Sequence, residues 1–183
     1  ARIVDRAVDV ARRSCDAVVL VLAPGVEWDG AAVDAVVVGG VTRSDSVRAG
    51  PAPGADDPEI VVVHDAARPP PSPALFEAVI EATRAGADAA IPGVPLVDTV
   101  KRVDGDRVRE TVPREELVAV QTPQAFRAAA LRAAHVHASD ASDDAALVEA
   151  NGGIVVVVEG ESRNFKITTP DDLAVANLLA ASR

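Results

Sequence analysis

Short apolar runs alternate with helix-like stretches along this chain of 183 residues. Runs rich in Val, Leu and Ile occur at 17–22, 34–38, 60–63 and 154–158, and β-branched runs of this length are typical of strands buried on both faces of a sheet. A further strand is predicted at 87–91, where the apolar residues are mainly alanine. Between several of them, apolar residues recur three or four positions apart, as on a helix with one buried face. Strands that alternate with helices predict an α/β fold with a doubly wound, mostly parallel sheet and right-handed crossovers.

Capping residues mark the ends of several predicted helices. Ser72, with a proline directly after it, is a typical helix start, and Gly86 ends that helix. Ser142, followed by two aspartates, starts another helix, which ends at Gly152. The Thr-Pro-Asp-Asp sequence at 169–172 opens the final helix with a cap, a proline and first-turn acids.

Residues 97–114 interrupt this alternation of strand and helix. Segments 99–103 and 107–112 predict two strands around an Asp-Gly turn at 104–105. The hairpin carries many basic and few apolar residues, and an isolated two-stranded ribbon is only marginally stable in water. We therefore expect it to act as a β-arm that packs on a second subunit in a homodimer. After the arm, residues 121–126 lead into an Ala-rich helix.

Composition narrows the class of protein. A formal charge of −10 argues against binding to bulk nucleic acid, which requires a basic surface. No apolar run reaches the length that spans a membrane, so no membrane association is expected. The single cysteine, Cys15, cannot form an intramolecular disulfide, which favours a reducing, cytoplasmic location. The length suits one domain that covers residues 1–183.

The strand at 60–63 breaks abruptly into a charged turn that holds an acid and a base, Asp65 and Arg68. In an open α/β sheet, ligands bind in the crevice beyond the carboxyl ends of the strands. A carboxylate there can hold a divalent metal ion, and a guanidinium group there can bind a phosphate. The alternative is an Asp–Arg pair that closes the loop and binds no ligand.

Other polar residues follow the ends of predicted strands in the same way. Loops at one sheet edge would bring together a carboxylate, several cations and several hydroxyl groups: Ser46, Asp65, Arg68, Thr99, Lys101, Thr122, Asp143 and Lys166. Arg114 adds a base at the foot of the hairpin. Such a set suits phosphoryl or nucleotidyl transfer, where positioning and charge neutralisation do most of the catalysis. By strand alternation His64 points to the opposite face and is structural, and His135 is expected at the surface.

Six motifs in a fixed order resemble those of one enzyme family. They are Gly39-Gly40 with Ser46-Val47, Val63-His64-Asp65-Ala66-Ala67-Arg68-Pro69, Asp98-Thr99-Val100-Lys101-Arg102, Thr122-Pro123-Gln124-Ala125-Phe126, Ser142-Asp143-Asp144-Ala145 and Asn164-Phe165-Lys166-Ile167-Thr168. From its first helix to its last, the chain resembles the 2-C-methyl-D-erythritol 4-phosphate cytidylyltransferases of the non-mevalonate isoprenoid pathway. The resemblance implies a Rossmann-like nucleotidyltransferase fold and a homodimer held by the β-arm. It also implies transfer of CMP from CTP to a sugar phosphate, with release of pyrophosphate.

The resemblance further implies roles for individual residues. Asp65 matches the acid that binds Mg²⁺ in the family. Positions that contact the nucleotide are matched by Gly40, Ser46, Ala66 and Lys166. Positions that hold the sugar phosphate are matched by Arg68, Thr99, Arg114, Thr122 and Ser142. Arg114 is contributed across the dimer, and the expected catalytic residues are Asp65, Arg114 and Lys166.

The front of the chain departs from the family pattern. The family begins with a strand and a Gly-rich loop whose Arg and Lys hold the triphosphate, and neither precedes Ala1. Under the enzyme hypothesis, we therefore expect the chain to be part of a longer polypeptide. Two alternatives stay open: a ribitol-5-phosphate cytidylyltransferase of the same architecture, and a non-catalytic dimeric homologue that cannot activate CTP.

Overall fold

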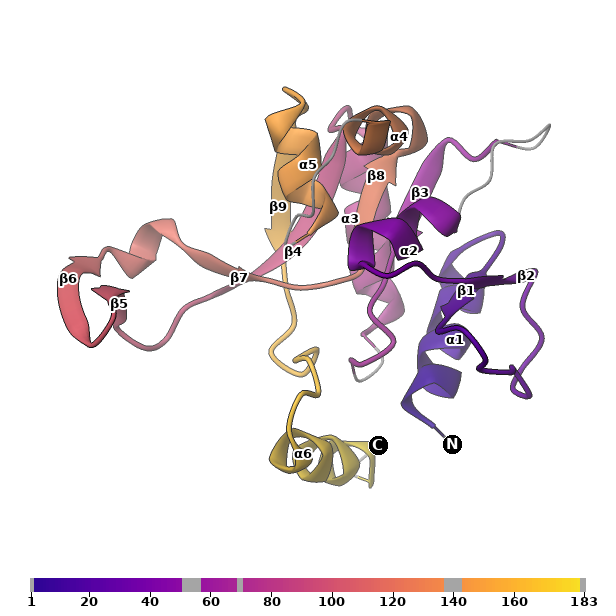
Figure 1. The fold of residues 1–183 in the computed structure, drawn as a ribbon, viewed down its shortest axis with the longest axis horizontal. Coiled ribbons are helices and arrows are strands. Elements are labelled where there is room, and N and C mark those ends of the chain that lie inside the picture. The colour runs from indigo at the N-terminus through magenta and orange to yellow at the C-terminus, as the bar shows by residue number, and fades with distance from the viewer. Residues whose placement is uncertain (1, 51–56, 69–70, 137–142, 182–183) are drawn as a thin grey trace.

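The computed structural model describes residues 2–50, 57–68, 71–136 and 143–181 of the chain (Figure 1). A main sheet is covered by helices, a hairpin projects to one side, and a smaller sheet lies near the N-terminal helix. The α/β class expected from the sequence is confirmed. Across these described ranges, no helix is both long enough and apolar enough to cross a membrane.

The main sheet has five strands, in the order β3, β8, β4, β7, with β9 paired to β4. Their bounds are β3 (Ile60–Val63), β4 (Ala89–Pro95), β7 (Val118–Val120), β8 (Gln124–Arg127) and β9 (Val155–Glu159). Strand β8 is antiparallel to both β3 and β4, whereas β9 is parallel to β4. Strands β3, β4 and β9 therefore run in one direction, so their carboxyl ends point to the same edge of the sheet.

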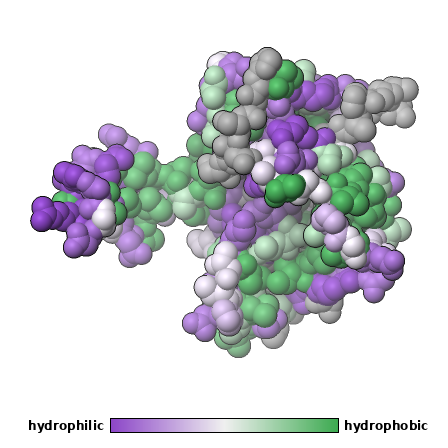
Figure 2. Space-filling model, in the orientation of Figure 1, coloured by the Kyte–Doolittle hydropathy of each residue, from purple (hydrophilic) through white to green (hydrophobic). Residues whose placement is uncertain are grey.

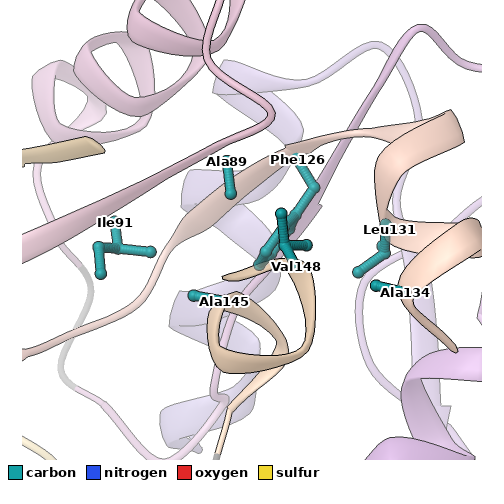
Figure 3. Close-up of a cluster of buried hydrophobic side chains, with 7 residues drawn as sticks. All are labelled: Ala89, Ile91, Phe126, Leu131, Ala134, Ala145 and Val148. Carbon is teal, nitrogen blue, oxygen red and sulfur yellow. The ribbon is translucent and has the colours of Figure 1, made fainter. Parts of the chain in front are cut away.

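One face of the main sheet packs against α4 (Ala128–Val136) and α5 (Asp144–Ala150). Figure 3 shows this core cluster, whose buried members come from β4, β8 and these two helices: Ala89, Ile91, Phe126, Leu131, Ala134, Ala145 and Val148. The chain has only 3 Phe and 1 Trp, so small aliphatic side chains supply most of the cluster.

The opposite face packs against α3 (Pro73–Arg84). Ala90 and Ala125 point to this face, because successive side chains of a strand alternate between the two faces. Both are fully buried beneath Val79 of α3. Helices thus cover both faces of the main sheet, as the sequence predicts for a doubly wound fold. The sheet itself is mixed and not mostly parallel as expected, because only β4 and β9 pair in parallel within it.

Polar residues cap the N-termini of α3, α5 and α6. Ser72 starts α3 by accepting a backbone N–H hydrogen bond at 3.2 Å, and Thr169 starts α6 (Pro170–Ala181) by accepting one at 3.1 Å. Both caps agree with the sequence prediction. Helix α5 has Asp143 as its N-cap, with a hydrogen bond of 2.9 Å, and the predicted cap Ser142 lies outside the described residues.

A second, smaller sheet pairs β1 (Val19–Leu22) with β2 (Ala35–Val38) in parallel. Helix α1 (Ile3–Ser14) precedes it and contacts α3, while α2 (Arg43–Ala49) follows β2. The buried residues of α1 are Ala7, Val8 and Val10. These contacts place the small sheet beside the main sheet without strand pairing between the two.

Residues 97–114 include the predicted hairpin. Strands β5 (Val100–Asp104) and β6 (Arg107–Val112) pair antiparallel in a sheet of their own, and a 3₁₀ helix, Arg114–Glu116, follows. Gly105 in the turn has a φ of 58°, in the left-handed region that favours glycine. Figure 1 shows the hairpin projecting from the main sheet, and Figure 2 shows that its tip is polar and its base more apolar.

Two strands and one helix differ from the sequence expectation. Strand β8 lies where only a lead-in to a helix was expected, and β7 and α2 lie where no element was expected. Strand β8 is short and lies between β3 and β4, with Ala125 and Phe126 fully buried. A strand covered on both faces shows no polar alternation, so its four residues carry too little pattern to be assigned.

Candidate active site

Loops after β3, before β8 and after β9 converge at one edge of the main sheet. The backbone N–H group of Asp65, just after β3, donates a hydrogen bond to Thr122 Oγ1, just before β8, over 3.0 Å. The backbone N–H group of Ile167, after β9, donates to the carbonyl of Ala67 over 2.8 Å. The convergence follows from the common direction of β3 and β9, because loops that follow parallel strands meet at one edge.

The carboxylate of Asp65 lies between two cations at this edge. Its Oδ2 atom is 3.2 Å from Lys166 Nζ and 3.8 Å from Arg68 Nε. The side chain of Lys166 is 49% exposed, whereas those of Asp65 and Arg68 are 21% and 9% exposed. The structure thus brings together three residues that the sequence singled out, and Lys166 is the cation that a ligand can reach.

The guanidinium group of Arg68 is mostly buried and binds other parts of the protein. Its Nη1 group donates to the carbonyl of Asn164 over 2.7 Å. Its Nε group is buried and has no hydrogen-bond partner in the described part of the chain, because 3.8 Å to Asp65 is an ion-pair distance and too long for a hydrogen bond. Burial lowers the pKa of this guanidinium group, and the charge of Asp65 opposes that shift.

Two buried amide side chains, for which no role was predicted, hold the loops in place. Asn164 Nδ2 donates to the carbonyl of Thr122 over 2.8 Å and to Gln121 Oε1 over 3.3 Å. Gln121 also donates to the carbonyl of Glu161 over 2.9 Å and accepts from its N–H group over 3.1 Å. The only sequence signal was position, since Asn164 starts one of the six motifs and Gln121 directly precedes another.

The hydroxyl group of Thr122 lies between His64 and the backbone of Asp65. His64 Nδ1 is 3.0 Å from Thr122 Oγ1, and Thr122 is only 4% exposed. The imidazole also packs edge-on against the ring of Phe76, and burial lowers the pKa of His64 to about 4. The expectation that His64 points away from the site is wrong, because β3 ends at Val63 and its alternation does not extend to the next residue.

Gly39 and Gly40 leave no room for a side chain between β2 and α2. A Cβ atom on Gly40 would lie 2.1 Å from Asp45 Cβ, and one on Gly39 would lie 2.7 Å from Ser46 Oγ. Ser46 Oγ donates to the carbonyl of Thr42 over 3.0 Å, and hydrogen bonds from Thr42 lower the pKa of Asp45. These bonds cap the start of α2, and the close contacts with Asp45 and Ser46 are the reason that the two preceding positions require glycine.

The predicted site residues on the arm do not join Asp65 within one chain. Arg114 donates a hydrogen bond to the carbonyl of Val97, and its Nε lies 3.9 Å from the Glu115 carboxylate. Thr99 lies at the start of the same arm and is exposed. Figure 1 shows this arm extending away from the sheet edge that holds Asp65.

A buried carboxylate links α2, α4 and α5 on the other side of the core. Asp144 is fully buried, and its carboxylate accepts a hydrogen bond from Arg43 Nη1 over 2.6 Å. His135 Nε2 lies 2.9 Å from the other carboxylate oxygen. His135 is 7% exposed, so the expectation that it lies at the surface is wrong. Ser142, the predicted site residue two positions before Asp144, lies outside the described residues.

Metal binding rests on one acidic residue. Within the ranges that the structure describes, no group of three or more His, Cys, Asp or Glu side chains is placed to hold a metal ion. Mg²⁺ in enzymes of phosphate chemistry commonly takes one or two carboxylates and fills its other positions with phosphate oxygens and water. Asp65 fits that donor set when a phosphorylated ligand supplies the remaining oxygens.

Comparison with known proteins decides the family. A sequence model described as IspD, 2-C-methyl-D-erythritol 4-phosphate cytidylyltransferase, matches residues 1–182. The chain belongs to the 2-C-methyl-D-erythritol 4-phosphate cytidylyltransferase family. The family suggested by the six sequence motifs is thereby confirmed.

Curated members of the cytidylyltransferase family are close in sequence but longer. The chain is 51% identical over 146 residues to the 2-C-methyl-D-erythritol 4-phosphate cytidylyltransferase of Rhodococcus jostii (strain RHA1), which covers 79% of this chain and 64% of that protein. It is 50% identical over 139 residues to the bifunctional enzyme IspD/IspF of Solidesulfovibrio magneticus, which covers 74% of this chain and 35% of that protein. The chain therefore spans between 35% and 64% of the length of these relatives.

Solved structures of the same cytidylyltransferase family share the fold. The 2-C-methyl-D-erythritol 4-phosphate cytidylyltransferase from Thermus thermophilus superimposes with a TM-score of 0.86 at 38% identity, covering 99% of this chain and 90% of that chain. The bifunctional IspDF from Campylobacter jejuni superimposes with a TM-score of 0.73 at 25% identity, covering 94% of this chain and 45% of that chain. The Rossmann-like nucleotidyltransferase fold is thus confirmed.

Proposed function

We propose that this protein is a cytidylyltransferase that transfers CMP from CTP to 2-C-methyl-D-erythritol 4-phosphate and releases pyrophosphate. The observation that carries the proposal is the cluster of Asp65, Arg68 and Lys166 at the sheet edge where β3 and β9 end. A carboxylate between two cations, at the ligand-binding edge of an α/β sheet, suits a reaction between phosphates. Enzymes named for this activity, such as one at 51% identity, support the choice of substrates.

The reaction has little covalent chemistry for the protein to perform. An oxygen of the sugar phosphate attacks the α-phosphorus of CTP, and the bond from that phosphorus to the departing pyrophosphate oxygen breaks on the opposite side. Negative charge grows on the phosphate oxygens during this exchange, so a positioned cation lowers the barrier. Lys166 takes that role because its side chain is half exposed and its Nζ is 3.2 Å from Asp65.

Mg²⁺ is the divalent cation that we propose, with Asp65 as its protein ligand. The Asp65 side chain is 21% exposed, so one face of the carboxylate is accessible. When bound, the ion would neutralise triphosphate oxygens and orient them. Lys166 and Arg68 lie beside the same carboxylate, and we propose that they hold Asp65 in place for the ion.

The nucleotide is proposed to lie near Gly40, Ser46 and Ala66. Gly40 supports this because it is exposed beside Ser46, although its own Cβ direction is filled by Asp45. Ala66 is exposed and directly follows Asp65, which supports a position beside the nucleotide. Ser46 is held at the start of α2 by its bond to the carbonyl of Thr42.

The sugar phosphate is proposed to lie between two chains of a homodimer. Thr99 and Arg114 are on the β-arm, away from the Asp65 of their own chain, so they would act in the site of the partner subunit. Support comes from the arm itself, which forms a sheet of its own and exposes Val97 and Val103 to 82% and 58%. Apolar side chains on an isolated ribbon are expected to be covered by another surface. Thr122 and Ser142 complete the proposed substrate set.

A cytoplasmic location is part of the proposal. Cys15 is the only cysteine of this chain and is free, so no intramolecular disulfide stabilises the fold. Chains of this kind suit a reducing compartment.

The direct test is product formation by the full-length protein with CTP and each candidate acceptor. We expect pyrophosphate release and a diphosphocytidyl product with 2-C-methyl-D-erythritol 4-phosphate, and little with ribitol 5-phosphate. Faster turnover of ribitol 5-phosphate would contradict the proposed acceptor. Binding of the sugar phosphate without any pyrophosphate release would instead support the non-catalytic alternative.

A further inference from the structure

The hydroxyl group of Thr122 is held by two neighbours at the centre of the site. It accepts the Asp65 backbone N–H group over 3.0 Å, and it lies 3.0 Å from His64 Nδ1. Among the described residues, these are its only two hydrogen-bond partners. Thr122 is 4% exposed, so bulk water does not compete for these bonds.

The direction of the bond between Thr122 and His64 decides what the hydroxyl group can offer to a ligand. A threonine hydroxyl has one proton to donate and two lone pairs that accept. One lone pair is used by the backbone N–H group of Asp65. If His64 Nδ1 carries a proton, it occupies the second lone pair and leaves the hydroxyl proton free. If Nδ1 carries no proton, the hydroxyl group donates its only proton to His64 and cannot donate to a ligand.

The surroundings of the other ring nitrogen favour a proton on Nδ1. His64 Nε2 is buried and has no hydrogen-bond partner in the described part of the chain. Its ring packs against Phe76, with 5.6 Å between ring centroids and 60° between ring planes. A buried N–H group without a partner is rarer in proteins than an unsatisfied acceptor, and an aromatic ring is only a weak acceptor.

We propose that His64 is a positioning residue whose Nδ1–H group donates to Thr122 Oγ1 and so aims the hydroxyl proton of Thr122 at a phosphate oxygen of the bound substrate. The identity of that acceptor rests on the proposed function, whereas the direction of the hydrogen bond does not. With both lone pairs occupied, the hydroxyl cannot rotate, and its proton points along the one remaining tetrahedral direction. His64 therefore makes the hydroxyl group of Thr122 a fixed donor at the place where the loops after β3 and before β8 meet.

A nitrogen-15 correlation spectrum of the imidazole tests the direction of the bond without any activity measurement. The chain contains 3 His, so the His64 signals are identified by their loss in the His64→Asn variant. At pH 7 we expect Nδ1 to give the signal of a protonated nitrogen and Nε2 that of a bare nitrogen. The reverse assignment would overturn the proposal whether or not the protein is a cytidylyltransferase.

Matched variants of the full-length protein test the consequence for the substrate. Leu and Asn are similar in size, but only Asn has an N–H group to donate at the position of Nδ1. We expect His64→Leu to raise the KM for the sugar phosphate about tenfold, as for one lost hydrogen bond to a charged group, with the KM for CTP unchanged. In His64→Asn, the KM for the sugar phosphate should stay close to that of the wild type. An equal rise in the KM for the sugar phosphate in both variants, or equal changes in the KM values for the sugar phosphate and CTP, would contradict a positioning role. Thermal unfolding of each variant shows whether it is folded, which separates these results from misfolding.

Discussion

At the scale of single residues, the two cations beside Asp65 have different surroundings and so different uses. Arg68 is 9% exposed at its side chain and donates to the carbonyl of Asn164, which fixes the loop after β3 to the loop after β9. Lys166 is 49% exposed and is held only by the carboxylate of Asp65, 3.2 Å away, among the residues that the structure describes. A flexible, exposed ammonium group can turn towards a phosphate, whereas a buried guanidinium group cannot. Lys166 is therefore the cation on which we expect catalysis to depend.

Replacement of Lys166 tests this difference. We expect Lys166→Met to lower kcat/KM about 10²- to 10³-fold, because it removes a positive charge that stabilises the growing phosphate charge. Lys166→Arg should lose less, since it keeps the charge but changes its geometry. Steady-state kinetics of pyrophosphate release provide the measurement, and near-normal kcat/KM in Lys166→Met would refute the role.

Residues at strand ends could be placed from the sequence, and residues that act through burial could not. Asp65 and Lys166 follow apolar runs, and parallel strands bring such positions to one edge. The role of Asn164 depends on its contact with Thr122, which is 42 positions away in the chain, and on its burial, which leaves only 1% of the residue exposed. The residues next to Asn164 in the sequence do not predict that contact. His64 was misplaced because the strand ends one residue before it.

At the scale of helices and strands, Asp144 joins three helices through one buried carboxylate. It accepts from Arg43 of α2 over 2.6 Å and lies 2.9 Å from His135 of α4, while it forms the first turn of α5. A buried carboxylate is stable only when partners replace the water it has lost. This pairing fixes α2, which follows the glycine pair, relative to α5.

Removal of this carboxylate should destabilise the protein strongly. We expect Asp144→Ala to lower the free energy of unfolding by about 3–5 kcal/mol, because Arg43 and His135 lose their shared partner. Glu149→Ala, an exposed acid of the same helix, should change it by less than about 0.5 kcal/mol. Urea unfolding followed by circular dichroism measures both, and similar values for the two variants would contradict the network.

The cap of α6 should depend on pH through Asp172. Its carboxylate accepts hydrogen bonds from the backbone of Thr168 and Thr169, which lowers the pKa of Asp172 from 3.8 to about 2. A lowered pKa in the folded state means that the cap stabilises α6 above pH 3.8 and is lost as the pH falls towards 2. The Tm of the wild type should therefore exceed that of Asp172→Asn at pH 7, and the gap should close over that range. A gap that stays constant down to pH 2 would show that the carboxylate charge has no role.

Elements with capping residues were predictable, whereas the strands in the middle of the sheet were not. Ser72 and Thr169 mark helix starts by local chemistry that needs no tertiary partner. Strands β7 and β8 are of 3 and 4 residues and owe their conformation to pairing with β3 and β4. The antiparallel direction of β8 is set by its pairing in the assembled sheet and cannot be predicted from its own four residues.

At the scale of the whole molecule, the β-arm stands apart from the main sheet (Figure 1). Val103 and Val108 are cross-strand partners on this arm, and both stay exposed, at 58% and 60%. Two valines that meet across a hairpin without burial form an apolar spot that a partner subunit can cover. The arm therefore supports the proposed homodimer, in which each chain would complete the substrate site of the other.

Charged replacements on the arm test the homodimer. We expect the wild type to sediment as a dimer and the double variant Val103→Asp with Val108→Asp to sediment as a monomer, because a buried unpaired charge opposes association. Val26→Asp changes a valine of similar exposure, 55%, outside the arm and should leave the dimer intact. Analytical ultracentrifugation measures the masses. A monomeric wild type, or a dimeric double variant, would contradict the role of the arm.

The central claim is that Asp65 and Lys166, at a loop held by Arg68, form the reacting centre of a cytidylyltransferase. Pyrophosphate release from CTP and 2-C-methyl-D-erythritol 4-phosphate, measured with the full-length protein and its Asp65→Asn variant, tests it most directly. Asp65→Asn keeps the size of the side chain but removes its charge, so we expect kcat/KM to fall about 100-fold or more. Asp9→Asn, a change at an exposed acid of α1, serves as the matched control and should leave the rate unchanged. Near-normal pyrophosphate release by Asp65→Asn would contradict the account.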